Sequence, residues 1–352
     1  MGLIRWLPMS RLFVAALARS RESRSRVRRA FDRTIVVLCY HDLRRAEDLD
    51  SWLRVDVDAF REHLALLSAC GTVISPSAIQ SIQDLPGVGP HFVLTFDDGY
   101  ANWLRLAVPV LEEFGFQALF FASTHHVLTG EPFWFDRVVV ALQSTCVSRL
   151  DLRRFGLADY SFRAGPPERR WDDIEQLLRD MKRVGNPGSA GFDAVLSHLD
   201  FVAQGNTDGD LRPLSVEELR RMAVRDSCQF GSHGHRHEIL TRVGRRLMLA
   251  SFTESKKHLE LLTGRRICDI AYPNGDCDGD VTTTCREVGY ERGFTAASGL
   301  VVWPNVDPYR IPRLLVGGYD SKRRLADRLG GLLLEAIVGP ASRRNHRRIS
   351  RL

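Results

Sequence analysis

Short apolar runs alternate with helical patterns along the chain from Thr34 onward. The helical stretches have recognisable boundaries: Ser215, followed three residues later by Glu218, predicts a capped helix start, and Gly115 and Gly264 predict two helix ends. Because a strand-then-helix alternation is typical of a largely parallel sheet, the pattern predicts an α/β fold. The predicted strands are residues 34–41, 91–96, 117–123, 228–232, 267–273 and 294–298.

The alternation breaks between about Phe133 and Pro213. This stretch is charged, contains three clusters of proline and glycine, and otherwise shows mostly helical patches. We interpret it as an insertion over one end of a barrel, with an independently folded helical subdomain as the alternative.

Composition narrows the class of protein. The chain has 352 residues, of which 44% are hydrophobic and 26% charged, which excludes collagen-like, coiled-coil and wholly disordered proteins. Seven cysteines are scattered without a CxxC pair, so they indicate buried free thiols rather than a disulfide framework or a zinc knuckle.

The net charge of +6 is unevenly distributed. Residues 1–33 carry nine Arg against Glu22 and Asp32, and residues 341–352 carry five Arg and no acid. With +7 and +5 in these tails, residues 34–340 have a net charge of −6. An acidic body argues against a nucleic-acid partner, whereas basic tails suit contact with an anionic membrane face or, equally, a solvated disordered tail.

Targeting signals are weak. Residues 12–18 are the only candidate for the apolar part of a signal peptide, and no apolar stretch reaches 18 residues. Apolar residues interleave with Arg5 and Arg11, a pattern that suits an amphipathic segment on a membrane surface. We expect a cytoplasmic protein, with peripheral contact at the inner membrane face as a further option, and the sequence leaves the oligomeric state open.

Two adjacent carboxylates, Asp97 and Asp98, directly follow the predicted strand at residues 91–96. Active sites of α/β barrels lie at the carboxyl ends of the strands. Neighbouring residues of an extended chain point in different directions, so one carboxylate can bind a metal while the other faces a water. Asp-Asp-Gly is also common turn chemistry, and taken alone the turn is the better interpretation.

Three histidines occur within five residues after the strand predicted at 228–232. His233 and His237 are four residues apart, so on a helical turn they would share one face and could bind one ion. His235, between them, is expected to point away. Two histidines and one carboxylate suit a hydrolytic metal site as readily as a non-haem iron site, so the spacing leaves the chemistry open.

A third segment, AYPNG at residues 271–275, is best explained by itself as a Pro-Asn-Gly turn. Together, however, the three segments resemble the polysaccharide deacetylase family, also called the NodB-homology or carbohydrate esterase 4 group. TFDDGY, SHGHRH and AYPNG are similar to its first motif, its second H-x-x-x-H motif and its third R-x-P-x-G motif. The resemblance extends from about Ile35 to Asp320, and its specificity lies in the order and combination of the motifs.

The resemblance implies a distorted (β/α) TIM-like barrel of the NodB type, with a helical insertion, that acts as a metal-dependent N-deacetylase. By the family's pattern, Asp98, His233 and His237 bind a divalent metal, usually Zn²⁺, and Asp97 is the general base. The backbone N–H of Asn274 occupies the motif position that holds the oxyanion. The implied division is a basic segment at 1–33, a catalytic domain at 34–320 with the insertion at about 133–213, and a C-terminal helix with a basic tail at 321–352.

Two departures from the family's pattern concern the proton-handling half of the site. The Arg of the third motif is Ala271 here, and residues 313–318 contain no counterpart of the catalytic His of the fifth motif. The fourth motif's Asp is not evident near residues 295–303 either. We expect Arg313 to replace the missing Arg, and His41, at the end of the first predicted strand, to act as the acid for the leaving group. A packed strand-end histidine is an equal alternative for His41.

The function expected is removal of an N-acetyl group from an amino sugar of a polysaccharide or glycan precursor, with an N-acetylated glycan as the substrate. The alternatives are a deacylase of another amide, such as a cyclic imide or a formyl-sugar lipid, and a non-catalytic glycan-binding relative. Asp97 beside all three ligands speaks against the last, since a binding module needs no base. Four aromatic residues in predicted loops could stack on sugars, although anchoring of loops is the commoner role: Phe133, Trp134, Phe135 and Trp303.

Overall fold

The computed structural model describes residues 31–338 except 49–50, 81–84, 86–88, 145–147, 163–169, 186–189, 203–210 and 303–305. The candidate signal peptide, the amphipathic N-terminal segment, the C-terminal basic tail and Trp303 therefore lie outside the described residues. Among the helices that are described, none combines the length and the hydropathy needed to cross a membrane.

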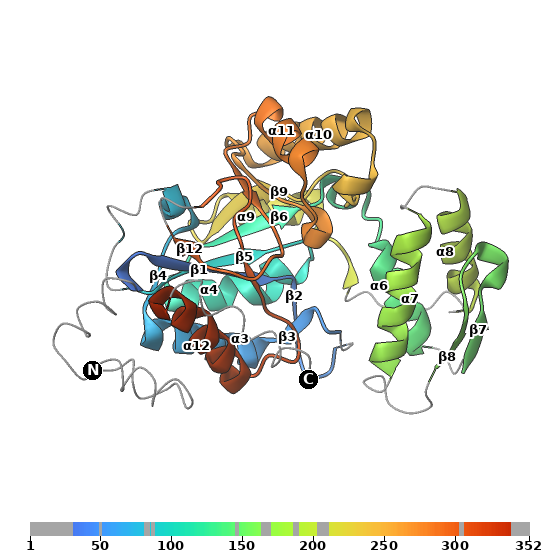
Figure 1. Cartoon of the computed structure of the whole chain (residues 1–352), viewed down its shortest axis with the longest axis horizontal. Coiled ribbons are helices and arrows are strands. Elements are labelled where there is room, and N and C mark those ends of the chain that lie inside the picture. Colours follow the sequence, from blue (N-terminus) through green and yellow to red (C-terminus); the bar gives the residue numbers. More distant parts are fainter. Residues whose placement is uncertain are drawn as a thin grey trace.

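A curled, mostly parallel sheet forms the centre of the fold (Figure 1). Its strands run in the order β11-β10-β9-β6-β5-β1-β12, with β13 also paired to β1 and β4 to β5. Their bounds are β1 Thr34–Tyr40, β4 Thr72–Val73, β5 His91–Phe96, β6 Ala118–Ala122, β9 Cys228–Ser232, β10 Asp269–Ala271, β11 Arg292–Phe294, β12 Val301–Val302 and β13 Leu314–Leu315.

The two edges of the curled sheet are brought together by the segment from Ile311 to Leu315. Ile311 forms a parallel bridge with Phe294 of β11, and Leu314 pairs with Leu38 of β1. The strands are almost wholly buried, as expected for a parallel sheet covered by helices on its outer face. The predicted α/β barrel is therefore confirmed, in a distorted form.

Helices on the outside of the barrel follow the local signals in the sequence. Asp56 caps the first of them with its carboxylate, which accepts from the Asp58 and Ala59 N–H groups, and the predicted capping box of Ser215 and Glu218 is present. These helices are α3 Val57–Cys70, α4 Val108–Phe114 preceded by a π-helical turn at Trp103–Ala107, α5 Thr124–Thr129, α9 Val216–Ala223, α10 Arg245–Thr263, α11 Gly279–Val288 and α12 Lys322–Val338.

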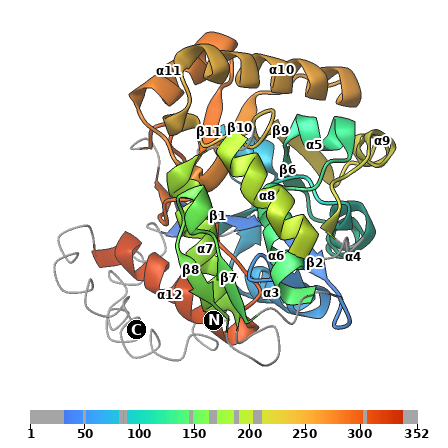
Figure 2. The ribbon, with the colours of Figure 1, turned by 90° about the vertical axis from the view of Figure 1, so that its right-hand side faces the viewer.

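The inserted stretch forms a lobe beside the barrel with a hydrophobic cluster of its own (Figures 1 and 2). Ile174, Leu177 and Met181 lie on one face of its second helix and are fully buried against Leu199 and other apolar residues. The lobe is mostly helical, as predicted, and adds a small antiparallel hairpin that the sequence did not indicate. Its elements are α6 Trp134–Ser144, β7 Arg149–Asp151, β8 Asp159–Ser161, α7 Trp171–Val184 and α8 Ala190–Val202.

Two strand predictions need correction. The last predicted strand, at residues 294–298, lies earlier, at Arg292–Phe294, and the strand predicted at 267–273 shrinks to Asp269–Ala271. Pairing explains both shifts, because Asp269 lies opposite Arg292 and Ala271 opposite Phe294, so only these residues have a neighbour in register. After Phe294 the chain turns toward the segment that closes the barrel, where the Thr295 N–H donates to the Ile311 carbonyl.

Candidate active site

Strand register brings the candidate residues to one end of the barrel. Tyr40 of β1 lies opposite Phe96 of β5, so the residues that follow, His41 and Asp97, emerge side by side, and the Asp97 N–H donates to the Tyr40 carbonyl at 3.0 Å. His233 directly follows β9. Asn274 follows β10 in a 3₁₀ turn at Pro273–Gly275. This end holds the carboxyl termini of the parallel strands, where α/β barrels place their active sites.

Asp98 and the two outer histidines of the second motif converge on one point. The Asp98 Oδ1 atom lies 3.2 Å from the His233 Nε2 atom and 3.2 Å from the His237 Nε2 atom. One ligand atom of each residue lies within 4.8 Å of the others, a spacing suited to a metal ion. We call these three residues the Asp98 cluster.

The helical turn expected at the histidines is wrong. Residues 233–239 form an irregular loop, and two left-handed positions, Gly234 at φ 72° and His237 at φ 57°, turn the second imidazole back toward the first. His235 points away from the cluster, as predicted, because its Nδ1 bonds the Thr124 hydroxyl at 2.9 Å and its Nε2 lies 3.4 Å from Glu254.

Backbone contacts fix the orientation of His233. Its Nδ1 lies 2.9 Å from the carbonyl oxygen of Ala271, and since a carbonyl can only accept, Nδ1 carries the proton. The unprotonated Nε2 is thereby directed at Asp98, which is the arrangement that metal-ligating histidines use. Ala271 lacks the arginine side chain of the family's third motif, but its backbone carbonyl orients His233.

The Asp98 cluster fits a divalent cation. Asp98 is 2% exposed, and its Oδ1 atom has no hydrogen-bond partner among the described residues. Burial alone would raise the pKa of this carboxyl, but the imidazoles of His233 and His237, when each carries a second proton on Nε2, lower it well below its usual range, so Asp98 is ionised. Two imidazole nitrogens and one carboxylate oxygen form a donor set typical of zinc sites that keep an open position.

Asp97 faces the other way and is held by Arg313. The guanidinium donates from Nη1 to Oδ1 and from Nη2 to Oδ2, both at 2.6 Å, while its Nε donates to the Thr295 carbonyl at 2.9 Å. Burial would raise the pKa of Asp97, but the Arg313 charge outweighs it and keeps the pKa below the ordinary value. Arg313, which lies far from Asp97 in the sequence, thus contacts this carboxylate directly, as expected.

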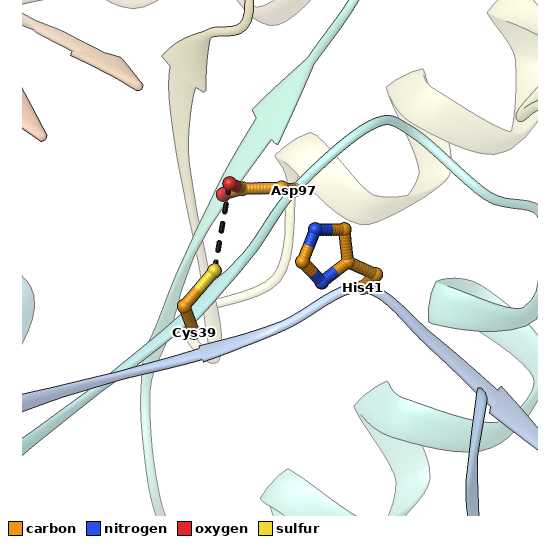
Figure 3. Close-up of side chains that lie close together, drawn as sticks. All are labelled: Cys39, His41 and Asp97. Carbon is orange, nitrogen blue, oxygen red and sulfur yellow. Dashed lines mark hydrogen bonds between the residues drawn. The ribbon is translucent and has the colours of Figure 1, made fainter. Parts of the chain in front are cut away.

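Cys39 and His41 complete the surroundings of Asp97 (Figure 3). The Cys39 thiol donates to the Asp97 Oδ2 atom at 3.5 Å. His41 lies just beyond β1, its backbone carbonyl accepts from the Trp103 indole at 2.6 Å, and its Nδ1 atom has no partner among the described residues. Burial lowers the pKa of the His41 imidazole, although the carboxylates of Asp98 and Asp97 oppose this shift. We call Cys39, His41 and Asp97 the Asp97 cluster.

Asn274 lies at the mouth of the site and contacts the inserted lobe. Its backbone is left-handed, at φ 60°. Its side-chain oxygen accepts from the Lys182 ammonium of α7 at 2.6 Å, and its amide nitrogen donates to Asp276 at 2.8 Å. Lys182 and Asn274 line a recess together with the metal-ligand candidate His237.

Two residues of the site were missed from the sequence. Cys39 could have been predicted, because it lies two positions before His41 and alternate residues of a strand share a face. Lys182 could not, since it lies in a charged helix far from every motif and reaches the site only through the packing of the lobe.

Of the aromatic residues predicted to lie in loops, Trp134 and Phe135 instead lie in the first turn of α6, and Phe133 directly precedes that helix. Phe133 and Trp134 are buried, which favours an anchoring role for these two.

Family membership follows from comparison of the sequence. The profile described as polysaccharide deacetylase matches residues 86–186 and 196–293, more than half of the chain. The chain therefore belongs to the polysaccharide deacetylase family. Among curated proteins it is similar to the poly-beta-1,6-N-acetyl-D-glucosamine N-deacetylase of Escherichia coli strain K12, with 23% identity over 301 residues. That match covers 84% of this chain but only 38% of the relative.

Solved structures confirm the fold. IcaB from Ammonifex degensii superimposes with a TM-score of 0.55 and 19% identity, covering 84% of this chain and 97% of that one. The Streptococcus pyogenes deacetylase PplD in complex with acetate gives a TM-score of 0.54 and 17% identity, covering 83% of this chain and 96% of that one. These matches span the barrel predicted from the sequence.

Proposed function

We propose that this protein is a metal-dependent hydrolase that removes the N-acetyl group from an amino sugar of a polysaccharide or glycan precursor. The observation that carries the proposal is the different surroundings of two adjacent carboxylates. Asp98 faces two imidazoles, and Asp97 accepts two hydrogen bonds from Arg313. Family membership supports it, as does the similarity to the poly-beta-1,6-N-acetyl-D-glucosamine N-deacetylase of Escherichia coli.

We propose that the Asp98 cluster holds the metal and that the metal is Zn²⁺, because imidazole and carboxylate donors suit it. When bound, such a cation supplies Lewis-acid polarisation of an acyl oxygen and lowers the pKa of a water molecule toward neutrality. The remaining steps are assigned to side chains and backbone groups of this chain.

Asp97 is the general base in this proposal. Its pKa lies below the ordinary value, so the carboxylate is ionised at neutral pH and can accept the proton of the attacking water. The two bonds from Arg313 fix the direction of its oxygen atoms. The Asn274 N–H donates to the oxygen of the acetamide as negative charge develops on it.

His41 is the proposed donor of the proton that the amine leaving group needs. It lies in the Asp97 cluster and the residue is only partly buried, so a substrate nitrogen can approach its imidazole. Arg313 acts through Asp97 and is a positioning residue.

Elemental analysis of the purified protein, paired with acetate release from N-acetylglucosamine oligomers, tests the proposal in the wild type and in Asp97→Asn. We expect one divalent metal per chain in both proteins and turnover only in the wild type. Bound metal without turnover would indicate that the substrate is another amide, such as a cyclic imide or a formyl-sugar lipid, or that the protein binds glycans without hydrolysing them. Absence of metal from both proteins would refute the assignment of the ligands.

A further inference from the structure

Lys182 is a cation brought to the mouth of the site by the inserted lobe. It lies in the last turn of α7, and its ammonium donates to the Asn274 Oδ1 atom at 2.6 Å. Asn274 is the residue proposed to bind the oxyanion through its backbone. Lys182 is therefore in direct contact with a residue that we assign to the reaction.

The charge of Lys182 has no direct counterpart. Among the described residues it forms no ion pair, and its only acceptor is a neutral amide oxygen, although an ammonium has three donors. Asp276 and Asp98 act on its charge only from a distance, and Asp276 accepts a bond from the Asn274 amide nitrogen. Arg242 also reaches this place, where its guanidinium donates to the Lys182 carbonyl. The positive charge of Arg242 therefore acts on Lys182 as well.

Apolar side chains form the rest of the recess. Trp134, Phe192 and Ile239 line it beside His237, and the Trp134 and Phe192 rings pack edge-to-face with centroids 5.1 Å apart. Against this apolar wall, Lys182, Asn274 and His237 are the polar side chains of the recess. Trp134, Phe192 and Ile239 are each at least nine-tenths buried.

A cation at the end of a helix has a simpler explanation, since basic residues in the last turn complement the helix dipole. The next residue, Arg183, fits that explanation, because its side chain is 71% exposed and pairs with Asp180 of the same helix at 3.0 Å. Lys182 instead turns away from its own helix toward Asn274. The two neighbours thus share a helix turn and a charge but differ in where the charge points.

We propose that Lys182 binds a negatively charged group of the glycan, next to the sugar that carries the N-acetyl group, and so selects anionic substrates. The inference rests on the proposed function, because it assumes that the glycan lies between the Asp98 cluster and the lobe. A carboxylate of a uronic acid and a phosphate on the sugar share the required chemistry. The anion replaces or joins the Asn274 oxygen as acceptor for the ammonium.

The test uses three probes: a neutral N-acetylglucosamine tetramer, a tetrasaccharide of alternating N-acetylglucosamine and glucuronate, and N-acetylglucosamine 1-phosphate. Acetate release gives kcat and KM, and calorimetry on the Asp97→Asn protein gives Kd without turnover. Lys182→Gln removes the charge but keeps a donor for Asn274. Arg183→Gln removes a charge from the same helix turn and is the matched control.

We expect Lys182→Gln to raise KM and Kd about tenfold for the anionic probe that fits, because the lost hydrogen bond joins two charged groups. The rise should be at least about fivefold smaller for the neutral tetramer. Lys182→Arg should restore most of the affinity, and Arg183→Gln should match the wild type. Which of the two anionic probes responds identifies the source of the charge.

Three results would overturn the proposal: equal effects of Lys182→Gln on neutral and anionic probes, equal effects of Arg183→Gln and Lys182→Gln, or no preference of the wild type for either anionic probe. If the wild type released no acetate from any probe, the proposed function would fail. The Kd values from calorimetry would still decide whether Lys182 binds the anion.

Discussion

The Asp98 and Asp97 clusters contain similar groups at similar spacing, yet they are suited to different tasks. Each offers three ligand atoms that lie within 4.8 Å of one another, and the two carboxylates are adjacent in the sequence. In the Asp98 cluster the carboxylate oxygen that faces the imidazoles has no hydrogen-bond donor among the described residues. In the Asp97 cluster both carboxylate oxygens accept short bonds from Arg313.

The guanidinium disfavours a metal at the Asp97 cluster. It neutralises the carboxylate and would repel a cation at close range. Cys39 does not help, because burial raises the pKa of its thiol well above the ordinary value, and only a thiolate is a good metal ligand. The comparison teaches that the neighbours of a donor set, more than its members, decide whether it binds a metal or handles protons.

The largest effect is expected at the Asp98 cluster. His233→Ala removes one of three ligands, so we expect loss of the bound metal and a fall in acetate release of more than about a thousandfold. Elemental analysis and an acetate assay measure the two. His235→Ala is the control, since the same motif supplies it and its ring faces Thr124 and Glu254. Full metal occupancy in His233→Ala would contradict the assignment.

His41→Ala should have the next largest effect. We expect a loss of about 10²–10⁴-fold on a sugar acetamide, because its amine leaves only when protonated. The loss should be far smaller on an aryl acetate ester, whose phenolate leaves without a proton, and the metal content should not change. Equal losses on both substrates would contradict a role for His41 as the acid.

Arg313→Lys sharpens the comparison through pH. Lysine cannot form the bidentate hydrogen bonds that Arg313 makes to the Asp97 carboxylate, so the pKa of Asp97 should rise from its lowered value. The base then becomes protonated at a higher pH than in the wild type, so the acid limb of the kcat/KM profile shifts to higher pH. The plateau value of kcat/KM should fall about tenfold to a hundredfold. Arg313→Ala is less informative, because an unpaired buried carboxylate costs about 3–5 kcal/mol of folding stability.

An unchanged acid limb in Arg313→Lys would show that Arg313 does not set the charge state of Asp97. The metal content serves as the control here, since the Asp98 cluster is left intact.

Cys39→Ser should have the smallest effect. A serine hydroxyl can donate to Asp97 as the thiol does, so we expect activity within about threefold of the wild type and an unchanged metal content. Cys228→Ser, at a buried cysteine that begins β9, controls for the loss of a packed thiol. A fall in bound metal in Cys39→Ser alone would show that the Asp97 cluster binds a cation after all.

Most of the barrel could be predicted because its signals are local. The buried runs at β1, β5 and β9 stand out as apolar segments, and Gly115 and Gly264 end helices in the left-handed conformation, as predicted. The ends of β10 and β11 could not be predicted, since strand length there depends on which residues find a partner in register. Apolar character alone marks too long a segment.

The candidate site, like the barrel, could be predicted only in part. The sequence marked Asp97, Asp98, His233 and His237 as candidates, through their spacing and their likeness to the family's motifs. The geometry that joins the two histidines was mispredicted, because the turn depends on positive φ angles at Gly234 and His237 rather than on helical periodicity. The expected place of Arg313 beside Asp97 rested on a missing family residue, and the structure shows the contact itself.

The sequence by itself determined the α/β order and the strand ends that carry the chemistry, because these depend on periodicity and short spacings. Its resemblance to the family's motifs implied the residues of the Asp98 cluster. Only the tertiary structure decided that Arg313 reaches Asp97 across 216 positions of sequence, that Cys39 contacts the same carboxylate, and that Lys182 of the lobe contacts Asn274. Such contacts arise from barrel closure and lobe packing. Side chains distant in sequence acquire their neighbours there, and no local pattern encodes them.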